Sequence, residues 1–236
     1  MINMLEKIFV ERINKEDKKE IEDLTRNTWE WGDYITEVFD SWLNDGLFLK
    51  AIDENRKILG IIHVRIFEDF AWLEGIRIKS DIRRRGLGKF LTLKAMEKSI
   101  ANIFRLIVNE NNYSSIRLVT SLGFREIDKI YYIHKEKKVK VNEIIKDYGL
   151  KEVNQKLDIK GYINNWVWFP ISKYKGKIYS NDNMTLLDTD PPFAIKGILD
   201  NASFSTNNFI ENSESFLVFE LKLKSNEIFN ILHDFI

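Results

Sequence analysis

The chain has 236 residues, and its 36 lysines and arginines are balanced by 36 aspartates and glutamates, so the formal net charge is zero. A neutral chain lacks the overall positive charge that drives non-specific binding to nucleic acid or to an anionic membrane. The absence of cysteine excludes disulfides, thiolate metal ligands and a cysteine nucleophile. Neither a signal-like start nor a long apolar run is present, so we expect a soluble, cytoplasmic protein.

The first half of the chain alternates between strand and helix patterns. Asn14 is a plausible cap for the first helix, and Gly46 follows the second. The periodicity predicts strands and helices in the order βααβββαβαββ, over residues 7–13, 14–29, 33–46, 47–52, 57–66, 70–78, 87–102, 103–108, 114–124, 124–127 and 130–134. The strand–turn–helix–strand unit over 70–108 predicts two parallel strands joined by a right-handed crossover.

The charged run over 135–140 is the best candidate for a domain boundary. We therefore expect one domain over 1–135 and a smaller α+β domain over 141–236. In the second domain the patterns predict a helix, four strands and a closing helix, over 142–150, 166–171, 177–180, 193–199, 215–223 and 225–236. Nothing in this half carries a recognisable site motif. It could cap an acceptor cleft, form a homodimer interface or make a core of its own.

The stretch SDIRRRGLGKFL, at 80–91, places three arginines and two glycines where a strand ends and a helix begins. Helix N-termini leave backbone N–H groups unpaired and carry partial positive charge, so they receive phosphate well. Gly86 and Gly88 let an anion approach the backbone without a side chain in the way. The turn lacks both the Walker pattern and the full dinucleotide fingerprint. A solvated loop, a nucleic-acid patch and a phosphate cradle all remain open from these residues alone.

Two spaced motifs resemble those of the GNAT superfamily of acyl-CoA N-acyltransferases. Its coenzyme motif, a strand followed by Arg/Gln-x-x-Gly-x-Gly/Ala and a helix, is met by Arg83, Gly86 and Gly88, with Ile78 at the strand end. Its second motif is Asn-x-x-Ala-x-x-Leu-Tyr-x-x-x-Gly-Phe. The matching residues lie downstream at the same spacing: Asn112, Ser115, Leu118, Gly123 and Phe124. The resemblance covers about residues 7–135.

The resemblance implies an α/β fold with a mixed central sheet, flanking helices, and fourth and fifth strands splayed apart by a bulge. In the family, pantetheine enters that gap, and the turn cradles the pyrophosphate of acetyl-CoA. The residues that would bind the coenzyme here are Ile76, Arg77, Ile78, Arg83, Arg84, Arg85, Gly86, Leu87, Gly88, Lys89, Asn112 and Ser115. Acetyl-CoA would be the co-substrate, with no metal required.

Glu74 is the candidate general base. It lies nine residues before Arg83, where several family members carry a glutamate that acts directly or through water. Strand alternation predicts that Glu74 shares a face with Trp72 and Ile76, which would partly desolvate it. A solvent-facing strand glutamate is the alternative. An amine with a pKa near 10.4 is only about one part in a thousand neutral at pH 7, so a base would matter.

The general acid is harder to assign. The family's usual tyrosine, seven residues after the asparagine, is Val119 here. Either the thiolate leaves unaided, as a pKa of about 8.5 allows, or another tyrosine substitutes. Those tyrosines are Tyr113, Tyr131 and Tyr132. The histidines show no metal-ligand spacing, and we expect His63 to be a satisfied core residue; the three are His63, His134 and His233.

The acceptor is expected to be a primary amine. In the family, the first two helices shape the acceptor site, and here that segment is aromatic and acidic. Its candidates are Trp29, Trp31 and Tyr34 for the pocket, and Glu30, Asp33 and Glu37 for gripping a cation. AWLEGIRI, at 71–78, is similar to a subgroup that includes amino-acid α-N-acetyltransferases. We therefore expect a free amino acid or small amine. Alternatives are a protein N-terminus or lysine, a non-catalytic acetyl-CoA sensor, and a nucleic-acid-binding protein.

Overall fold

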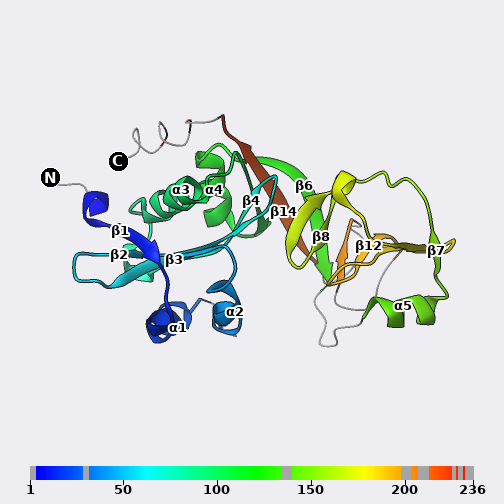
Figure 1. Cartoon of the computed structure of the whole chain (residues 1–236), viewed down its shortest axis with the longest axis horizontal. Coiled ribbons are helices and arrows are strands. Elements are labelled where there is room, and N and C mark those ends of the chain that lie inside the picture. The colour runs from blue at the N-terminus through cyan, green and yellow to red at the C-terminus, as the bar shows by residue number, and fades with distance from the viewer. Residues whose placement is uncertain are drawn as a thin grey trace. The chain divides into compact units, whose positions relative to one another are not determined.

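A computed structural model describes residues 4–28, 32–133, 140–197, 203–206 and 213–224, together with Glu227 and Ile231. Its contacts divide the chain into two compact units (Figure 1). The first unit comprises Met1–Arg105 and Leu221–Ile236, and the second comprises Leu106–Glu220. No helix in the described part of the chain is long and apolar enough to cross a bilayer.

The first unit is built on a mixed sheet with the strand order β1-β2-β3-β4-β5. Neighbouring strands are antiparallel except β4 and β5, which are parallel, as the sequence predicted. The elements are β1 (Phe9–Arg12), α1 (Lys18–Thr25), α2 (Ile35–Trp42), β2 (Leu47–Ile52), β3 (Ile58–Ile66), β4 (Ala71–Ile78), α3 (Leu87–Ser99) and β5 (Ile103–Asn109), with short 3-10 turns at Met4–Lys7, Lys15–Asp17 and Ser80–Ile82.

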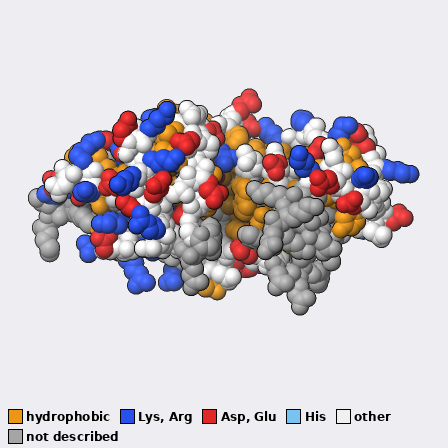
Figure 2. Space-filling view, turned by 90° about the horizontal axis from the view of Figure 1, so that it is seen from below, with side chains coloured by type: hydrophobic (Ala, Val, Ile, Leu, Met, Phe, Trp, Pro, Cys, Tyr) orange, Lys and Arg blue, Asp and Glu red, His pale blue; other side chains and the backbone are white. Residues whose placement is uncertain are grey.

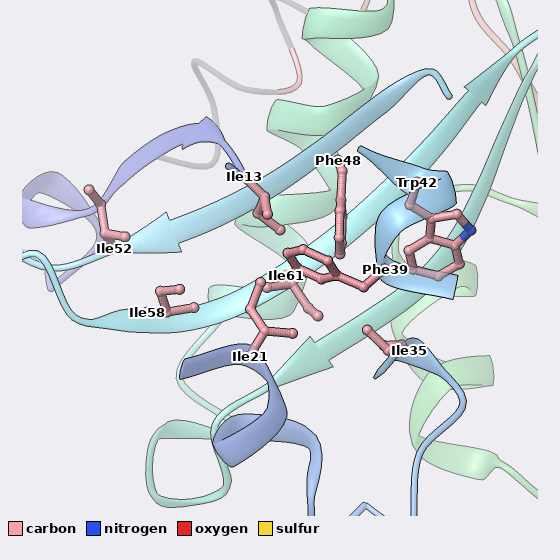
Figure 3. Packing of buried hydrophobic residues seen from close by; sticks show 9 residues of the cluster. All are labelled: Ile13, Ile21, Ile35, Phe39, Trp42, Phe48, Ile52, Ile58 and Ile61. Atoms are coloured by element: carbon pink, nitrogen blue, oxygen red, sulfur yellow. The ribbon is translucent and has the colours of Figure 1, made fainter. Parts of the chain in front are cut away.

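Helices cover both faces of this sheet, with α1 and α2 on one side and α3 on the other (Figure 1). The core beneath α1 and α2 follows from helical spacing, because Ile35, Phe39 and Trp42 recur on one face of α2. Figure 3 shows how this core packs; its members are Ile13, Ile21, Ile35, Phe39, Trp42, Phe48, Ile52, Ile58 and Ile61. Burying each large side chain contributes about 1.5–3 kcal/mol.

The second unit contains a longer, mainly antiparallel sheet. Beyond the end of β5 its strand order is β14-β6-β13-β12-β11-β10-β7, and β8 and β9 form a separate hairpin. The elements are α4 (Tyr113–Ser121), β6 (Arg125–Ile133), α5 (Val141–Tyr148), β7 (Lys151–Val153), β8 (Gly161–Asn164), β9 (Val167–Pro170), β10 (Ile178–Ser180), β11 (Thr185–Leu187), β12 (Phe193–Lys196), β13 (Ser203–Ser205) and β14 (Ser213–Lys222).

The two strands predicted over 124–127 and 130–134 are one strand, β6, so that prediction was wrong. The register against β14 shifts by one residue, because Val218 pairs with Asp128 and Phe219 pairs with Glu126. This bulge interrupts the alternation of inward and outward side chains, so the polar Asp128 belongs to one continuous strand and does not mark a turn. His134 and most of the predicted closing helix over 225–236 lie outside the described residues.

The last strand of the chain, β14, lies between β5 and β6 in the sheet. It pairs with β6 over eight register positions, from Ser213–Ile133 to Glu220–Arg125. Residues 134–212 are therefore inserted between two neighbouring antiparallel strands. Figure 2 shows basic and acidic side chains interspersed over the visible face, in keeping with their equal numbers.

The domain boundary near 135–141 stays a prediction, and the position of β14 provides its test. We expect a chain ending at residue 140 to be insoluble or unfolded, because it loses β14 and leaves the edge of β6 unpaired. A matched chain would replace 134–212 by Asn-Gly, a two-residue hairpin turn that joins Ile133 to Ser213. We expect this second chain to fold, as judged by circular dichroism and size-exclusion chromatography. A soluble, folded chain 1–140 would contradict this view.

Candidate active site

The arginine turn runs from the end of β4 to the start of α3. Arg84 and Gly86 both adopt left-handed backbone, with φ of 64° and 84°. Gly86 is the N-cap residue of α3, a helix of 13 residues. The three arginines are exposed, and Arg83 donates from Nε to the carbonyl oxygen of Ile78 at 2.9 Å. The turn thus presents three guanidinium groups beside the unpaired N–H groups of a helix N-terminus, a combination suited to an anion.

The strand preceding the turn separates from its parallel neighbour. The β4–β5 register contains only the pairs Ala71–Phe104 and Trp72–Arg105 among the described residues. On the other edge of β4, the N–H of Lys79 bonds to the carbonyl oxygen of Leu59 at 2.9 Å. Antiparallel alternation then turns the N–H and C=O of Ile78 away from β3. The expected splay is confirmed, and Ile78 faces the side from which β5 has departed.

A bulge at Gly75 and Ile76 sets which side chains follow Glu74. His63 pairs with Glu74 and Ile61 pairs with Arg77, so two residues of β4 oppose one residue of β3. Gly75 has φ of +64°, and a Cβ there would lie 2.3 Å from the Trp42 ring. Because the bulge adds one residue, Arg77 and not Ile76 shares the α2 face with Glu74. The alternation that placed Ile76 beside Glu74 was wrong at this point.

Glu74 is held by two neighbours on β3. Its Oε1 lies 2.8 Å from His63 Nδ1 and accepts a hydrogen bond of 2.8 Å from Arg65 Nε. The Glu74 side chain is only 13% exposed and that of Arg65 15%, while His63 is fully buried. The interpretation of Glu74 as a solvent-facing strand residue is therefore excluded. The carboxylate is placed in one orientation in a largely water-free part of the first unit.

Arg77 connects β4 to the segment before α2. It donates to both carboxylate oxygens of Asp33, at 2.6 and 3.1 Å, and to the carbonyl oxygen of Ile76 at 2.9 Å. The side chain of Asp33 is 1% exposed, and the Arg77 guanidinium lies 5.5 Å from the centre of the Tyr34 ring. Burial raises the pKa of the Tyr34 hydroxyl, and the nearby Glu74 charge adds to that shift. Tyr34 thus stays protonated at neutral pH.

A cavity of about 340 Å³ opens beside this ion pair, where α1 faces the segment leading into α2. It is lined by Glu22, Thr25, Arg26, Gly32, Asp33 and Thr36. The acceptor candidates Trp29, Glu30 and Trp31 lie outside the described residues. Of the remaining candidates, Asp33 lines the cavity, Tyr34 is next to it in the chain, and Glu37 is exposed.

The asparagine motif lies in the second unit, where its geometry is local. Asn112 caps α4 by accepting a hydrogen bond from the N–H of Ser115 at 3.1 Å. Val119 is buried, and Tyr113 is 64% exposed. Tyr131 and Tyr132 lie on β6, where Tyr132 packs against Trp166 and Phe204. Within the described residues, no group of three or more acidic or histidine side chains is arranged to hold a metal.

Sequence reasoning missed three contributors to the Glu74 environment. His63 was assigned to the core, and Arg65 and Asp45 were not singled out. His63 is indeed buried, but its ring is also hydrogen-bonded at both nitrogens, to Glu74 and to the carbonyl oxygen of Asp45 at 2.6 Å. Alternation could have found His63 and Arg65, because two residues of the same face precede Glu74 across one hairpin.

Comparison with known proteins agrees with this geometry. Residues 15–124 match the model of the acetyltransferase (GNAT) family. A Thermoplasma acidophilum structure described as that of an acetyltransferase is 18% identical, with a TM-score of 0.62 over 91% of this chain and 99% of that one. The ribosomal-protein-S18-alanine N-acetyltransferase of Escherichia coli is 14% identical, with a TM-score of 0.50 over 93% and 97%. Comparison with curated proteins gives no match.

Residues 15–124 are therefore a GNAT acetyltransferase domain, as the arginine turn and the asparagine motif led us to expect. The two solved structures, at identities below one fifth, share the fold with this chain. A domain of this family is an acetyl-CoA-dependent acetyltransferase, so the match over residues 15–124 supports acetyl-CoA as the co-substrate of that segment. The exposed arginine turn and the backbone of Ile78 suit that coenzyme in charge and direction.

The Gly75 bulge gives a direct test of the geometry of this site. We expect Gly75→Ala to lower the free energy of unfolding by about 2–4 kcal/mol, because left-handed backbone disfavours a Cβ and the new atom meets Trp42. Gly149→Ala is the matched control, with φ of +61° and nothing within 4 Å of the added carbon. It should lose only about 1 kcal/mol from backbone strain. Equal losses in urea unfolding would show that the Trp42 contact does not constrain the bulge.

Proposed function

We propose that this enzyme transfers the acetyl group to the primary amine of a free amino acid or small amine. Transfer would occur by direct attack within a ternary complex, with Glu74 as the general base. The observation that carries the proposal is the buried Glu74 carboxylate, fixed by His63 and Arg65 on the face where Arg77, Asp33 and Tyr34 gather. A carboxylate that is mostly buried and held in one orientation by charged partners is typical of a functional site.

The chemistry assigned to the chain's own residues is acid–base and electrostatic. Acetyl-CoA supplies the acetyl group as a thioester, whose C–S bond breaks as the C–N bond forms. Glu74 would accept the proton that the attacking nitrogen loses, so that a neutral amide results. The N–H of Ile78 would donate to the acetyl oxygen as it gains negative charge. The departing sulfur would take its proton from solvent, since Val119 offers none and a thiol is a good leaving group as its anion.

The coenzyme is assigned to the turn and the end of β4. Backbone groups of Ile76, Arg77 and Ile78 would meet the pantetheine, and the turn from Arg83 to Lys89 would surround the pyrophosphate. The left-handed conformations of Arg84 and Gly86 support this assignment, because they expose successive N–H groups at the start of α3. Asn112 and Ser115 keep the coenzyme role that the resemblance implies, alongside their observed role as a helix cap.

The acceptor class rests on the cavity beside Asp33. That carboxylate is already paired with Arg77, so Glu22 is the acidic lining residue better placed to attract a cationic amine. The cavity's modest volume favours a small amine. A protein N-terminus remains the second candidate, with peptides as its test substrates.

The function is tested by thiol release from acetyl-CoA with a panel of free amino acids, polyamines and short peptides. Because the chain has no cysteine, every thiol detected comes from coenzyme A. We expect the fastest release with free amino acids or small amines. Faster release with peptides than with any free amine would transfer the assignment to protein acetylation.

The role of Glu74 predicts a substrate-dependent loss in Glu74→Gln. Turnover of amines with a pKa near 10 should fall by about 10²–10⁴-fold, because nearly all of the amine must be deprotonated on the enzyme. An α-amine, already about a tenth neutral at pH 7, should lose less. The affinity for acetyl-CoA should not change. Equal kcat/KM values for the variant and the parent on both amine classes would remove Glu74 from the base role.

The coenzyme assignment predicts that Gly86→Glu abolishes acetyl-CoA binding, because it places bulk and negative charge where the pyrophosphate would lie. We expect Kd, measured by isothermal titration calorimetry, to rise by at least about 100-fold. Gly149→Glu is the control, since it makes the same change at another left-handed glycine in the second unit. If the Gly86→Glu protein is folded and its affinity for acetyl-CoA is unchanged, the turn does not bind the pyrophosphate.

A further inference from the structure

We propose that His63 is a positioning residue for Glu74: it holds Oε1 through Nδ1, so that Oε2 is the oxygen that receives the acceptor's proton. This inference rests on the proposed role of Glu74 as the base. It assigns a function to a histidine that sequence reasoning placed in the core. Its support comes from the hydrogen bonds of the ring, its packing, and the charges around it.

The hydrogen bonds of the His63 ring restrict where its protons can lie. Nε2 lies 2.6 Å from the carbonyl oxygen of Asp45, and a carbonyl can only accept, so Nε2 carries a proton. Nδ1 lies 2.8 Å from Oε1 of Glu74. Two lone pairs at that distance would repel, so one proton lies between these atoms. The His63–Glu74 pair therefore holds this proton before any amine binds.

Packing fixes the imidazole plane. The ring of His63 stacks on that of Trp42, with centroids 4.3 Å apart and planes 9° from parallel. Phe48 contacts it edge-on at 5.8 Å from the other neighbouring strand. His63 has no exposed surface. A ring held from two sides and bonded at both nitrogens cannot rotate without breaking contacts, so it transmits a fixed orientation to Glu74.

The two bonds to Glu74 both end on the same oxygen. Arg65 Nε donates to Oε1, as His63 does, while within the described part of the chain Oε2 accepts no hydrogen bond. The other charged groups near the pair are Asp45, whose carboxylate lies 3.7 Å from Arg65, and the Arg77–Asp33 ion pair beside Tyr34. Oε2 is thus the oxygen left to take the proton from the acceptor nitrogen.

The proton transfer balances without a further reactant. With the shared proton on His63, Glu74 is a carboxylate. An amine that arrives as an ammonium ion first loses one proton to Oε2, which passes it to solvent. The neutral nitrogen then forms its bond to the acetyl carbon and gives a second proton to Oε2 as the C–S bond breaks. The proton is then released to solvent, which returns the pair to its starting state. His63 keeps its Nε2 proton throughout, because the Asp45 carbonyl has no proton to exchange. His63 thus acts through Glu74 and does not touch the substrate.

The test compares two substitutions at His63 by kcat/KM for a high-pKa amine and for an α-amine. His63→Phe keeps the stacking on Trp42 but removes both hydrogen bonds, and we expect kcat/KM for a high-pKa amine to fall by about 10–100-fold. The α-amine should lose less, because His63 acts only through Glu74. His63→Gln can still donate to Oε1 and should recover part of the activity. Lys50→Met is the control, since it removes a buried ion pair with Asp17 elsewhere in the same sheet and should not lower kcat/KM for one amine class more than for the other.

Two further measurements separate this inference from the proposed function. Adding His63→Phe to Glu74→Gln should cost nothing more, because the pair acts as a unit. A slow Glu74→Gln together with a fully active His63→Phe would overturn the role of His63 alone, whereas an active Glu74→Gln would overturn the base itself. In the parent protein, ¹⁵N NMR of the three histidines should show one whose Nε2 carries a proton that is hydrogen-bonded to a carbonyl oxygen. A deprotonated Nε2 on His63 would contradict the arrangement even if no variant folds.

Discussion

The candidate active site depends on one extra residue in β4. The bulge at Gly75 and Ile76 lets Glu74 and Arg77 face α2 together, whereas a regular strand would turn one of them away. Only glycine suits the position, because the backbone is left-handed there and Trp42 occupies the space of a side chain. The pairing of β4 with β5 has already ended at Trp72, so the N–H of Ile78 faces a side of β4 that β5 no longer pairs with. Local strand geometry therefore determines where Glu74, the Arg77–Asp33 ion pair and the end of β4 that is assigned to the coenzyme lie.

The charges assembled by this bulge are costly to bury. Removing an ion from water costs several kcal/mol even after relaxation, so each must find a partner. Glu74 has Arg65 and His63, and Asp33 has the two-pronged contact with Arg77. Such a cluster adds little to stability compared with an apolar core of similar volume. The cluster instead fixes the orientation of the Glu74 carboxylate, so little rearrangement is needed when an amine binds.

The sequence predicted the parts of the site that depend on local pattern. Arg83, Gly86 and Gly88 identified the turn because a strand end, a glycine pair and a helix start leave a contiguous signature. Glu74 followed from the family resemblance, which places a glutamate nine residues before Arg83 in several members. The sequence could not place Arg77, since a bulge shifts the faces without changing composition. It also could not predict β7, β8, β11 and β13, each three or four residues long and too short for alternation to be read.

The pairing of strands that are far apart in the chain could not be predicted from the sequence either. The predicted strand over 215–223 was correct in type, yet nothing in its composition tells that β14 lies between β5 and β6, about 80 residues away from the latter in the chain. His63 shows the same limit in a single residue. A histidine in an apolar strand is usually a core residue; alternation could have placed it on the face of Glu74, but the direct pairing of the two residues is a property of the cross-strand register.

The most direct test of the account is chemical rescue of a variant that lacks the carboxylate. Glu74→Ala should fold, bind acetyl-CoA as the parent does, and acetylate high-pKa amines very slowly. Added formate or acetate should restore turnover in a concentration-dependent way, while chloride at equal ionic strength should not, because only a small carboxylate can accept the proton in place of Glu74. A folded Glu74→Ala enzyme that keeps the parent's turnover, or that no carboxylate restores, would contradict the assignment of Glu74 as the general base.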